Sequence, residues 1–336
     1  MKKIAWVILP ILVLAILIGV VWRLGLFSFD IMPKNLTPAT VKLKWLHQSQ
    51  FAGMYVAKEK GYYSREGLNV DLAPFSFEEP TIDAVAEGKA DFGVTGADEL
   101  IIARSKGLPL KAIAVIYKIN PYCAYSLKES GIVAPQDFVG KRIGLAQGIA
   151  ANSPYFLMMK KLDIDRGNIT EIVTGYDSTE LLNGSVDVLT GYIINEPHQV
   201  LEQGKQVNTI LSADYGVNIY ADVLFTRDDI LNENPLLAEK FLRATLDGWR
   251  YAIENIEESV GITLKYATDR TESHELYMLR TSIPLINTGK SPIGFMEESE
   301  WENAQNILLE QNLLTKKIDI HDVYTMDVFN KISQPQ

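Results

Sequence analysis

Hydrophobic and polar positions alternate along the chain in two periods, which predicts an alternation of strands and helices. The apolar residues Val41, Leu43 and Trp45 alternate with lysines, the period of a half-buried strand. The next segment, Gln50–Lys60, has the apolar spacing of a helix and ends before Gly61, a residue type that commonly terminates helices. Repeated strand–helix alternation indicates an α/β protein with largely parallel sheets.

The same alternation continues through two cycles. Strands are expected at Lys42–Leu46, Asn69–Ala73, Asp91–Thr95, Lys111–Ile116, Cys123–Lys128, Lys141–Ala146, Thr170–Val173, Val186–Tyr192, Val207–Leu211 and Tyr220–Thr226. Helices are expected at Gln50–Lys60, Pro80–Glu87, Asp98–Lys106, Ser153–Leu162, Ser178–Asn183 and Pro197–Gln203, with long amphipathic helices from Pro235 onward. Two cycles and a helical tail predict two lobes, each built on a mostly parallel sheet.

The order of the elements predicts a second lobe inserted into the first. We expect lobe 1 in residues 41–128 and 223–336, and lobe 2 in residues 129–222. The chain would then cross between the lobes near Ser126–Ser130 and Ala221–Thr226, and these crossings would form a hinge.

The N-terminus has the pattern of a membrane segment. Two lysines precede Ile4–Trp22, a run of 19 residues without a charge, and Arg23 follows. This length can cross the apolar core of a bilayer, about 30 Å thick, and no convincing cleavage site of small residues follows it. We expect residues 1–26 to be an uncleaved transmembrane anchor that starts in the cytoplasm, and residues 27–40 to tether an extracytoplasmic globular part. A cleaved signal peptide is the alternative.

Composition narrows the classes of function. The 336 residues are 47% hydrophobic and 22% charged, as in an ordinary globular protein, and the net charge of −10 argues against nucleic acid as a partner. The one cysteine, Cys123, leaves no internal disulfide, and its apolar setting predicts a packed thiol. The four histidines share no HxH or HxxxH spacing, so no metal site is expected.

The junction of the first strand and the first helix carries side chains that suit a flat, polar-edged molecule. Trp45 belongs either to the core or to a stacking surface, and Gln48 and Gln50 carry amides that both donate and accept hydrogen bonds. Open α/β sheets bind ligands at the carboxyl ends of their strands, beside helix starts. We therefore predict that Trp45, Gln48, Gln50 and Phe51 bind a ligand.

Two later loops repeat this arrangement. Gly96 and Ala97 follow an apolar strand and open a helix, where free N–H groups favour an anion or a carbonyl oxygen. Gly148 lies in a loop of small residues in the second cycle. Helix capping, by Asp98 in the first loop, is the alternative role of these positions.

A third segment, Tyr192–Pro197, ends a strand with polar side chains. Pro197 would start the next helix at its first turn. A carboxylate at this strand end could take a paired hydrogen bond from an amino-heterocycle. We predict Tyr192, Asn195 and Glu196 as ligand-binding residues, with neutralisation of the helix start as the alternative role of Glu196.

The opening segment also resembles a known family. The pattern W-x7-G-x-Y-V-A, from Trp45 to Ala57, followed by GYYSREGLNV, is similar to the start of periplasmic solute-binding proteins of the thiamine-pyrimidine-synthase-like group, relatives of the sulfonate, nitrate and taurine binders. Further similar segments are Asp83–Ile116, Asp137–Leu145, Gly191–Pro197 and Phe241–Val260. The resemblance implies the type II bilobed binding-protein fold, a small-molecule ligand lined by the Gly191–Pro197 segment, and an ABC permease as partner.

Enzymes also occur among the proteins that this chain resembles. The thiamine-pyrimidine synthases share the fold and consume a histidine of the opening segment together with bound pyridoxal phosphate, helped by a cysteine-rich iron-binding segment. Aligned on Trp45 and Gly53, that histidine position holds Phe51 here, and the chain has no cysteine cluster. We therefore expect a binding protein without a cofactor, with synthase-like activity as the alternative.

The sequence thus predicts a membrane-tethered, extracytoplasmic solute-binding protein that captures a small nitrogen heterocycle for an ABC permease. An aminopyrimidine precursor of thiamine is the first choice of ligand. Riboflavin-like rings, sulfonates and nitrate are the alternatives, and the lack of arginine in the predicted site segments argues against the two anions.

Overall fold

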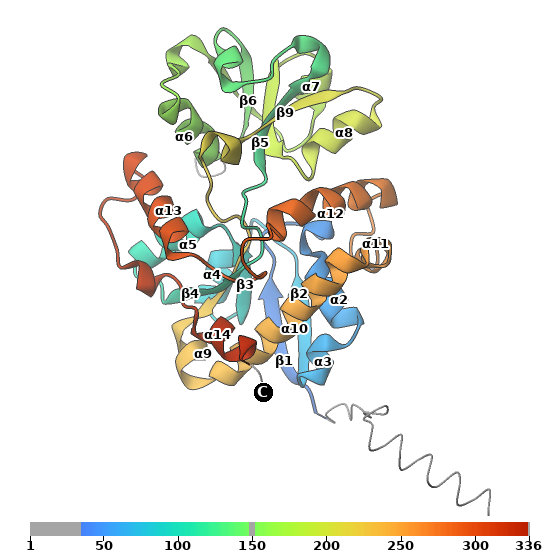
Figure 1. Cartoon of the computed structure of the whole chain (residues 1–336), viewed down its shortest axis with the longest axis vertical. Coiled ribbons are helices and arrows are strands. Elements are labelled where there is room, and N and C mark those ends of the chain that lie inside the picture. The colour runs from blue at the N-terminus through green and yellow to red at the C-terminus, as the bar shows by residue number, and fades with distance from the viewer. Residues whose placement is uncertain (1–34, 148–151, 335–336) are drawn as a thin grey trace, which may run out of the picture. The chain divides into compact units, whose positions relative to one another are not determined.

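The computed structural model describes residues 35–147 and 152–334, and its strands form two five-stranded sheets (Figure 1). The first sheet has the order β2-β1-β3-β10-β4, with β1 Thr37–Lys42, β2 Leu68–Ala73, β3 Phe92–Thr95, β4 Leu110–Val115 and β10 Val223–Arg227. The second has the order β7-β6-β8-β5-β9, with β5 Tyr122–Leu127, β6 Arg142–Ala146, β7 Thr170–Thr174, β8 Val188–Tyr192 and β9 Val207–Leu211. The prediction of an α/β protein with two sheets is confirmed.

Both sheets are mixed, so the expectation of mostly parallel sheets was wrong. In the first sheet, β1 pairs in parallel with β2 and β3, whereas β10 runs antiparallel to β3 and β4. In the second, β6 pairs in parallel with β7 and β8, whereas β5 runs antiparallel to β8 and β9. The antiparallel strands β5 and β10 are those that follow the crossings between the lobes. They are not joined to their neighbours by the crossover helices that make adjacent strands parallel.

The crossings lie in residues 116–121, between β4 and β5, and in residues 212–222, between β9 and β10. We expected the first at Ser126–Ser130, but Tyr122–Leu127 already pairs with β8 and β9 of the second sheet. The sequence of a buried apolar strand does not indicate which sheet the strand joins. The sequence alone therefore could not place the boundary between the lobes. The division of the chain into an inserted lobe and a returning lobe stays a proposal, with the crossings at these positions.

The first strand lies earlier than the expected Lys42–Leu46. β1 pairs with β2 in unbroken register, from Thr37 opposite Leu68 to Lys42 opposite Ala73. The apolar alternation continues beyond the strand because Leu43, although in the following loop, is fully buried.

The structure describes only part of the segment for which a tether and an anchor were predicted. Residues 37–40, expected to be part of a tether, belong to β1. The anchor expected at residues 1–26 lies outside the described residues. Across residues 35–147 and 152–334, every helix is too short or too polar to span a bilayer.

Helices cover both sheets (Figure 1). One core cluster joins the first sheet to α2 Ala52–Glu59, α3 Tyr62–Arg65, α9 Asp228–Glu233, α10 Pro235–Glu254, α11 Ile256–Thr263, α12 Glu272–Ile286 and α14 Asp327–Ser333. Another contains residues of α4 Thr81–Ala86, α5 Ala97–Ser105, α13 Glu298–Glu310 and α6 Ser153–Lys161, and α7 Thr179–Leu182 and α8 Glu196–Glu202 cover the second sheet. The helical tail from Pro235 is confirmed.

Gly53 explains one part of the opening motif. A Cβ at this position of α2 would overlap the ring of Trp249 on α10. Trp249 is 1% exposed, so the ring has no room to move aside. Glycine at position 53 therefore lets α2 and α10 approach closely, and the two helices fix the loop that precedes α2.

Candidate ligand-binding cleft

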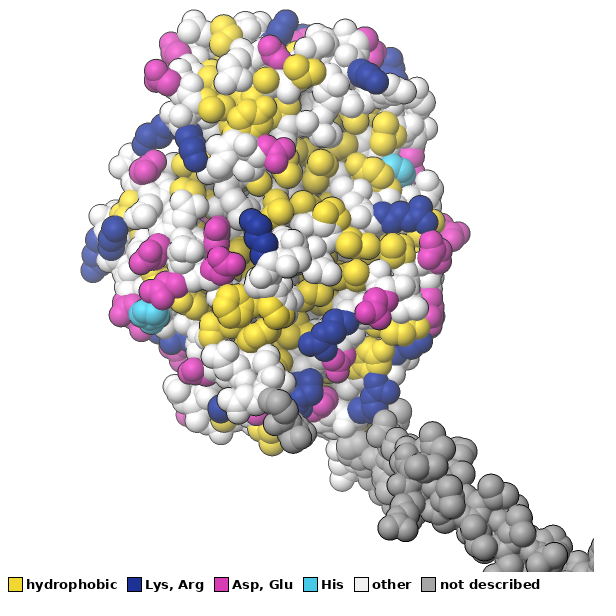
Figure 2. Space-filling model, in the orientation of Figure 1, with side chains coloured by type: hydrophobic (Ala, Val, Ile, Leu, Met, Phe, Trp, Pro, Cys, Tyr) yellow, Lys and Arg dark blue, Asp and Glu magenta, His cyan; other side chains and the backbone are white. Residues whose placement is uncertain are grey.

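A cavity of about 290 Å³ lies where the second lobe faces the first. It is close to the lower end of the size range of small-molecule pockets. It is lined by Lys44, Trp45, Gln48, Gln50, Phe75, Phe77, Gly96, Asp98, Glu99, Asn120, Tyr122, Ala146, Pro154, Gly175, Tyr176, Asp177, Thr190, Gly191, Tyr192, Asn195, Glu196, Tyr220 and Ala221. On the face drawn in Figure 2, charged side chains of both signs are scattered, whereas hydrophobic side chains gather across the middle.

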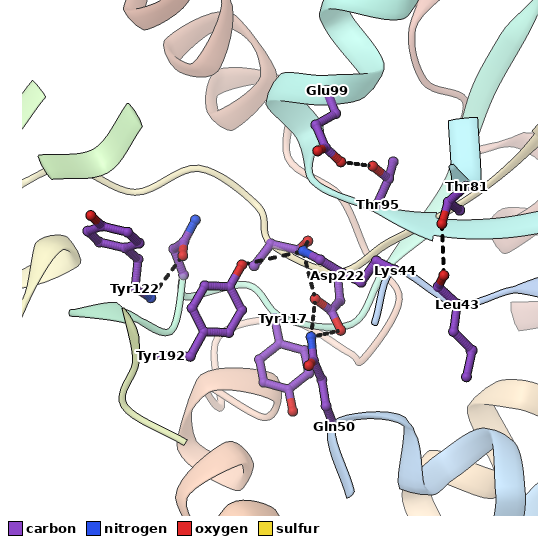
Figure 3. Close-up of polar contacts among 12 residues, drawn as sticks. Leu43, Lys44, Gln50, Thr81, Thr95, Glu99, Tyr117, Tyr122, Tyr192 and Asp222 are labelled. Atoms are coloured by element: carbon purple, nitrogen blue, oxygen red, sulfur yellow. Dashed lines mark hydrogen bonds and ion pairs between the residues drawn. The ribbon is translucent and has the colours of Figure 1, made fainter. Parts of the chain in front are cut away.

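A polar network forms the floor of the cavity (Figure 3). The Lys44 Nζ donates to the carbonyl oxygen of Ala221 at 2.7 Å and lies 3.4 Å from both the Tyr192 hydroxyl and the Asp222 Oδ1. The Gln50 Nε2 donates to both carboxylate oxygens of Asp222, at 3.0 and 2.9 Å. The network therefore joins the loop after β1 to the second crossing and to β8 of the other lobe.

The charged groups in this network stabilise each other's ionised forms. Burial by itself lowers the pKa of Lys44, but its acidic neighbours, above all Tyr192 and Asp222, raise that pKa above the ordinary lysine value. Burial raises the pKa of Asp222, and Lys44 and Gln50 oppose the shift. Lys44 is thus a fixed cation whose charge is already matched by protein groups.

One amide in the floor has an unused acceptor. The Gln48 Nε2 donates to the Gln50 Oε1 at 2.7 Å, which orients both amides. The Gln48 Oε1 is buried and, within the described residues, has no hydrogen-bond partner. Buried polar atoms are rarely left without a partner, so this oxygen is an unusual feature of the loop.

Acidic groups line the cavity from both lobes. Asp98, in the first turn of α5, has its pKa raised to about 6 by burial and by the adjacent Glu99. Glu99 accepts from the Thr95 hydroxyl. On the opposite side, burial raises the pKa of the Glu196 carboxyl at the start of α8.

Glu196 is held by its own segment. Its Oε2 accepts from the backbone N–H of Tyr192 and its Oε1 accepts from the Asn195 Nδ2, both at 2.7 Å. A Cβ on Gly191 would come within 2.7 Å of the Glu196 Oε2, so glycine leaves room for the carboxylate. The expected helix-start role and the predicted ligand role are therefore compatible, since each carboxylate oxygen can accept a second hydrogen bond.

Aromatic rings form the cleft wall beside β1 and β2 and continue onto the other lobe. Trp45 stacks on Phe75 with ring centroids 6.0 Å apart, and Phe75 meets Phe77 edge to face at 5.1 Å. Tyr176, from the second lobe, lies 5.3 Å from the Trp45 ring. Phe77 is 72% exposed and Tyr176 is 44% exposed, so these rings offer open faces at the cleft. Trp45 therefore contributes to a stacking surface.

The structure brings most of the predicted site residues to one cavity. Trp45, Gln48, Gln50, Gly96, Tyr192, Asn195 and Glu196 line it. Phe51 and Ala97 do not, because both are packed in core clusters, with 1% and 0% exposure. Gly148 lies outside the described residues. The binding role of all these residues stays a prediction.

Sequence reasoning missed several lining residues. Lys44 was assigned to the polar face of a strand, and only its burial between lobes reveals its place. Phe75 and Phe77 directly follow β2, and a search of every strand end for aromatic residues would have found them. Asn120 lies in the first crossing, which the sequence had placed elsewhere.

The chain is similar to one protein family and to several proteins with known names. Residues 48–259 match the profile of the family described as NMT1/THI5 like. The riboflavin-binding protein RibY of Chloroflexus aurantiacus is 26% identical over 303 residues, which cover 87% of this chain and 86% of that protein. The formylaminopyrimidine-binding protein of Halalkalibacterium halodurans is 26% identical over 304 residues, covering 86% and 90%.

An enzyme and a sulphonate-binding protein are also similar. The 4-amino-5-hydroxymethyl-2-methylpyrimidine phosphate synthase of Legionella pneumophila is 25% identical over 296 residues, covering 85% of this chain and 90% of that protein. Among solved structures, the periplasmic aliphatic sulphonate binding protein SsuA of Escherichia coli matches with a TM-score of 0.69 and 15% identity, covering 85% of this chain and 91% of that one. The fold is therefore that of periplasmic solute-binding proteins.

Proposed function

Because this chain belongs to the NMT1/THI5-like family, we propose that its cleft captures a small, planar nitrogen heterocycle, with an aminopyrimidine precursor of thiamine as first choice. One observation carries the proposal. Carboxylates from opposite lobes, Asp98 and Glu196, line the same cavity as Gln48. Ring-bound amino groups are donors, and such a ligand would satisfy acceptors on both lobes at once.

The charge of the lining supports a neutral or amine-bearing ligand over an anion. Among the described lining residues, four are carboxylates and one is a cation: Asp98, Glu99, Asp177 and Glu196 against Lys44. Lys44 is itself engaged with Asp222 and the Ala221 carbonyl. Sulfonates and nitrate would face more negative than positive charge here, which disfavours both.

A second ligand class is favoured by the aromatic wall. Trp45, Phe75, Phe77 and Tyr176 line the cleft, and the rings of Phe77 and Tyr176 are exposed to solvent. Such a wall could stack a fused ring larger than a pyrimidine, as in riboflavin. The related RibY is named as a riboflavin-binding protein. The second relative is named as a binding protein for formylaminopyrimidine, which has the smaller ring.

Capture is favoured over synthesis by two positions in this chain. Phe51 stands at the position that corresponds to the reactive histidine of the resembling synthases, and its side chain is buried in the core beside α2. Cys123, the one cysteine, is buried in β5. Incubation of the full chain with pyridoxal phosphate and ferrous iron, followed by analysis for pyrimidine products, tests the synthase alternative directly.

The proposed cellular role follows from the fold and the N-terminal sequence. We place the globular part outside the cytoplasmic membrane, tethered by residues 1–26, where it would present the ligand-bound form to an ABC permease. The fold shared with the periplasmic sulphonate-binding protein supports this placement.

Calorimetric titration of the full chain in mild detergent tests the proposal. We expect formylaminopyrimidine to bind and taurine and nitrate not to bind. Glu196→Gln should weaken the affinity about fivefold or more, since loss of one buried charged acceptor costs about 1 kcal/mol or more. Glu298→Gln, at an exposed ion pair with His321, should leave it unchanged. Riboflavin binding in place of the pyrimidine would select the second ligand class, and binding of taurine alone would overturn the proposal.

A further inference from the structure

Two histidines meet across the junction of the lobes, beside the cleft. His198 lies on α8 of the second lobe and His274 on α12 of the first, and their Nδ1 atoms are 3.2 Å apart. Glu202, one turn after His198, places its Oε1 3.6 Å from the His198 Nδ1 and its Oε2 3.9 Å from the His274 Nδ1. The three residues thus present nitrogen and oxygen atoms to one point.

These separations are close to the edges of a metal coordination tetrahedron. Zinc binds imidazole nitrogen at about 2.0–2.1 Å and carboxylate oxygen at about 2.0–2.2 Å, so two ligand atoms of one ion lie about 3.3–3.5 Å apart. The Nδ1–Nδ1 distance of 3.2 Å already fits this edge, and a small rotation of Glu202 would bring its oxygens to it. We propose that His198, Glu202 and His274 form a Zn²⁺ site that joins the two lobes.

The hydrogen bonds of His274 fix its ring in a tautomer that can bind a metal ion. Its Nε2 lies 2.8 Å from the Asn195 Oδ1, and the Asn195 Nδ2 donates to the Glu196 Oε1, which fixes the Asn195 oxygen as an acceptor. His274 therefore donates from Nε2 and keeps an unprotonated Nδ1, which accepts from the His198 Nδ1–H in the metal-free pair. A hydrogen bond from the distal ring nitrogen is the support that ligating histidines commonly have.

Burial and access suit an ion with one open position. His198 is 9% and His274 4% exposed, whereas the Glu202 side chain is 35% exposed. A surface hollow beside the pair is lined by His198 and Tyr277 among others, and the two rings stack at 4.4 Å. The buried rings fix two ligands, and the exposed side leaves room for ion entry and a water as fourth ligand.

Glu202 supplies a negative charge to the site, with carboxylate oxygens 3.6 Å from the His198 Nδ1 and 3.9 Å from the His274 Nδ1. The expectation of no metal site rested on His–His spacing alone, whereas this set combines an i, i+4 His–Glu pair with a histidine from the other lobe.

The site is connected to the cleft by hydrogen bonds. Asn195 accepts from His274 and donates to Glu196, and both Asn195 and Glu196 line the cavity. An ion bound to α8 and α12 at once favours the arrangement in which the lobes touch, and by linkage ligand and ion strengthen each other's binding. This coupling rests on the proposed function, whereas metal binding itself does not.

Titration of tag-free, chelator-stripped full chain with ZnCl₂ in mild detergent tests the site. We expect one Zn²⁺ per chain, and with Co²⁺ the visible absorption of a tetrahedral complex. His198→Ala and His274→Ala should each weaken Zn²⁺ binding at least about tenfold, since even loss of an outer partner of a metal ligand costs 10–100-fold. His321→Ala, at an exposed position on the first lobe, is the matched control and should bind Zn²⁺ as the parent does.

Each result decides the question. If the parent binds no Zn²⁺, or if the His198→Ala/His274→Ala double variant binds it as tightly as the parent, the site is wrong. Should a histidine variant lose its circular dichroism spectrum, Glu202→Gln at the exposed ligand provides the same comparison. Equal pyrimidine affinity with and without Zn²⁺ would overturn the coupling and leave the site. Failure of every heterocycle to bind would overturn the proposed function, and the Zn²⁺ titration would still decide the site.

Discussion

The Asp98 carboxyl group lines the cleft in surroundings that disfavour its ionised form. Its carboxylate lies beside Glu99, and Lys44 and the backbone N–H groups of Asp98 and Glu99 oppose the resulting rise in its pKa. Burial raises the pKa of Asp98 to about 6, from an ordinary value of 3.8. The folded protein therefore holds this proton more tightly than the unfolded chain does.

This proton has a consequence for stability against pH. Because the folded-state pKa is raised, the stabilisation is fully present below pH 4 and is lost as the pH rises through about 6. Asp98→Asn removes the titration, so its stability relative to the parent should improve as the pH rises from 4 to 7. Urea unfolding of both chains at several pH values measures the difference. A constant difference across this range would show that Asp98 ionises as freely folded as unfolded.

Some residues at the candidate site could be predicted from the sequence and others could not. The polar residues after β1 and at the end of β8 were predictable, because strand ends of α/β sheets are where ligands bind. Phe51 was not, since whether a residue next to Gln50 points to the cleft or to the core depends on the turn that opens α2. Lys44 and Asp222 meet only after the chain has returned from the second lobe, 178 residues later.

Among the elements, the packing of α2 on α10 holds the opening loop in place. Gly53→Ala would drive a methyl group into the Trp249 ring, and overpacking of this kind costs about 1–3 kcal/mol. Gly261→Ala on α11 is the matched control, because a Cβ there meets nothing within 4 Å. We expect it to raise stability by about 0.4–1 kcal/mol through the unfolded state. Denaturant midpoints of the two variants should move in opposite directions, and equal shifts would contradict the packing argument.

Most elements were predictable, and their pairing was not. Strands such as β2 and β9 and helices such as α5 and α6 lie within two residues of the expected bounds, because their apolar periods end at turns. The direction of β5 and β10 in the sheets was missed. Strand direction depends on long-range connections, and the local period of a strand is the same in either direction.

At the scale of the whole molecule, we propose that the two crossings act as a hinge between the lobes. Spin labels at Val173→Cys on the second lobe and Leu236→Cys on the first, which are 73% and 54% exposed in the parent, would report the rotation. We expect formylaminopyrimidine to shift and narrow the distance distribution, because a ligand held by both lobes selects one arrangement. An unchanged distribution at saturation would argue that the cleft binds without closure.

The native cysteine does not interfere with this measurement. Cys123 is 0% exposed, and burial raises the pKa of its thiol well above the ordinary value. The parent chain should therefore take up no label under native conditions, which serves as the control.

The proposed second lobe begins and ends with two strands that pair with each other. β5 begins at Tyr122, β9 ends at Leu211, and Cys123 lies opposite Leu211 in their ladder. A different lobe with the same two end strands could be grafted at these points without cutting the first sheet. Descendants of one ancestral receptor could therefore acquire new solutes by replacing a cassette, while the half that carries the N-terminal segment is inherited unchanged.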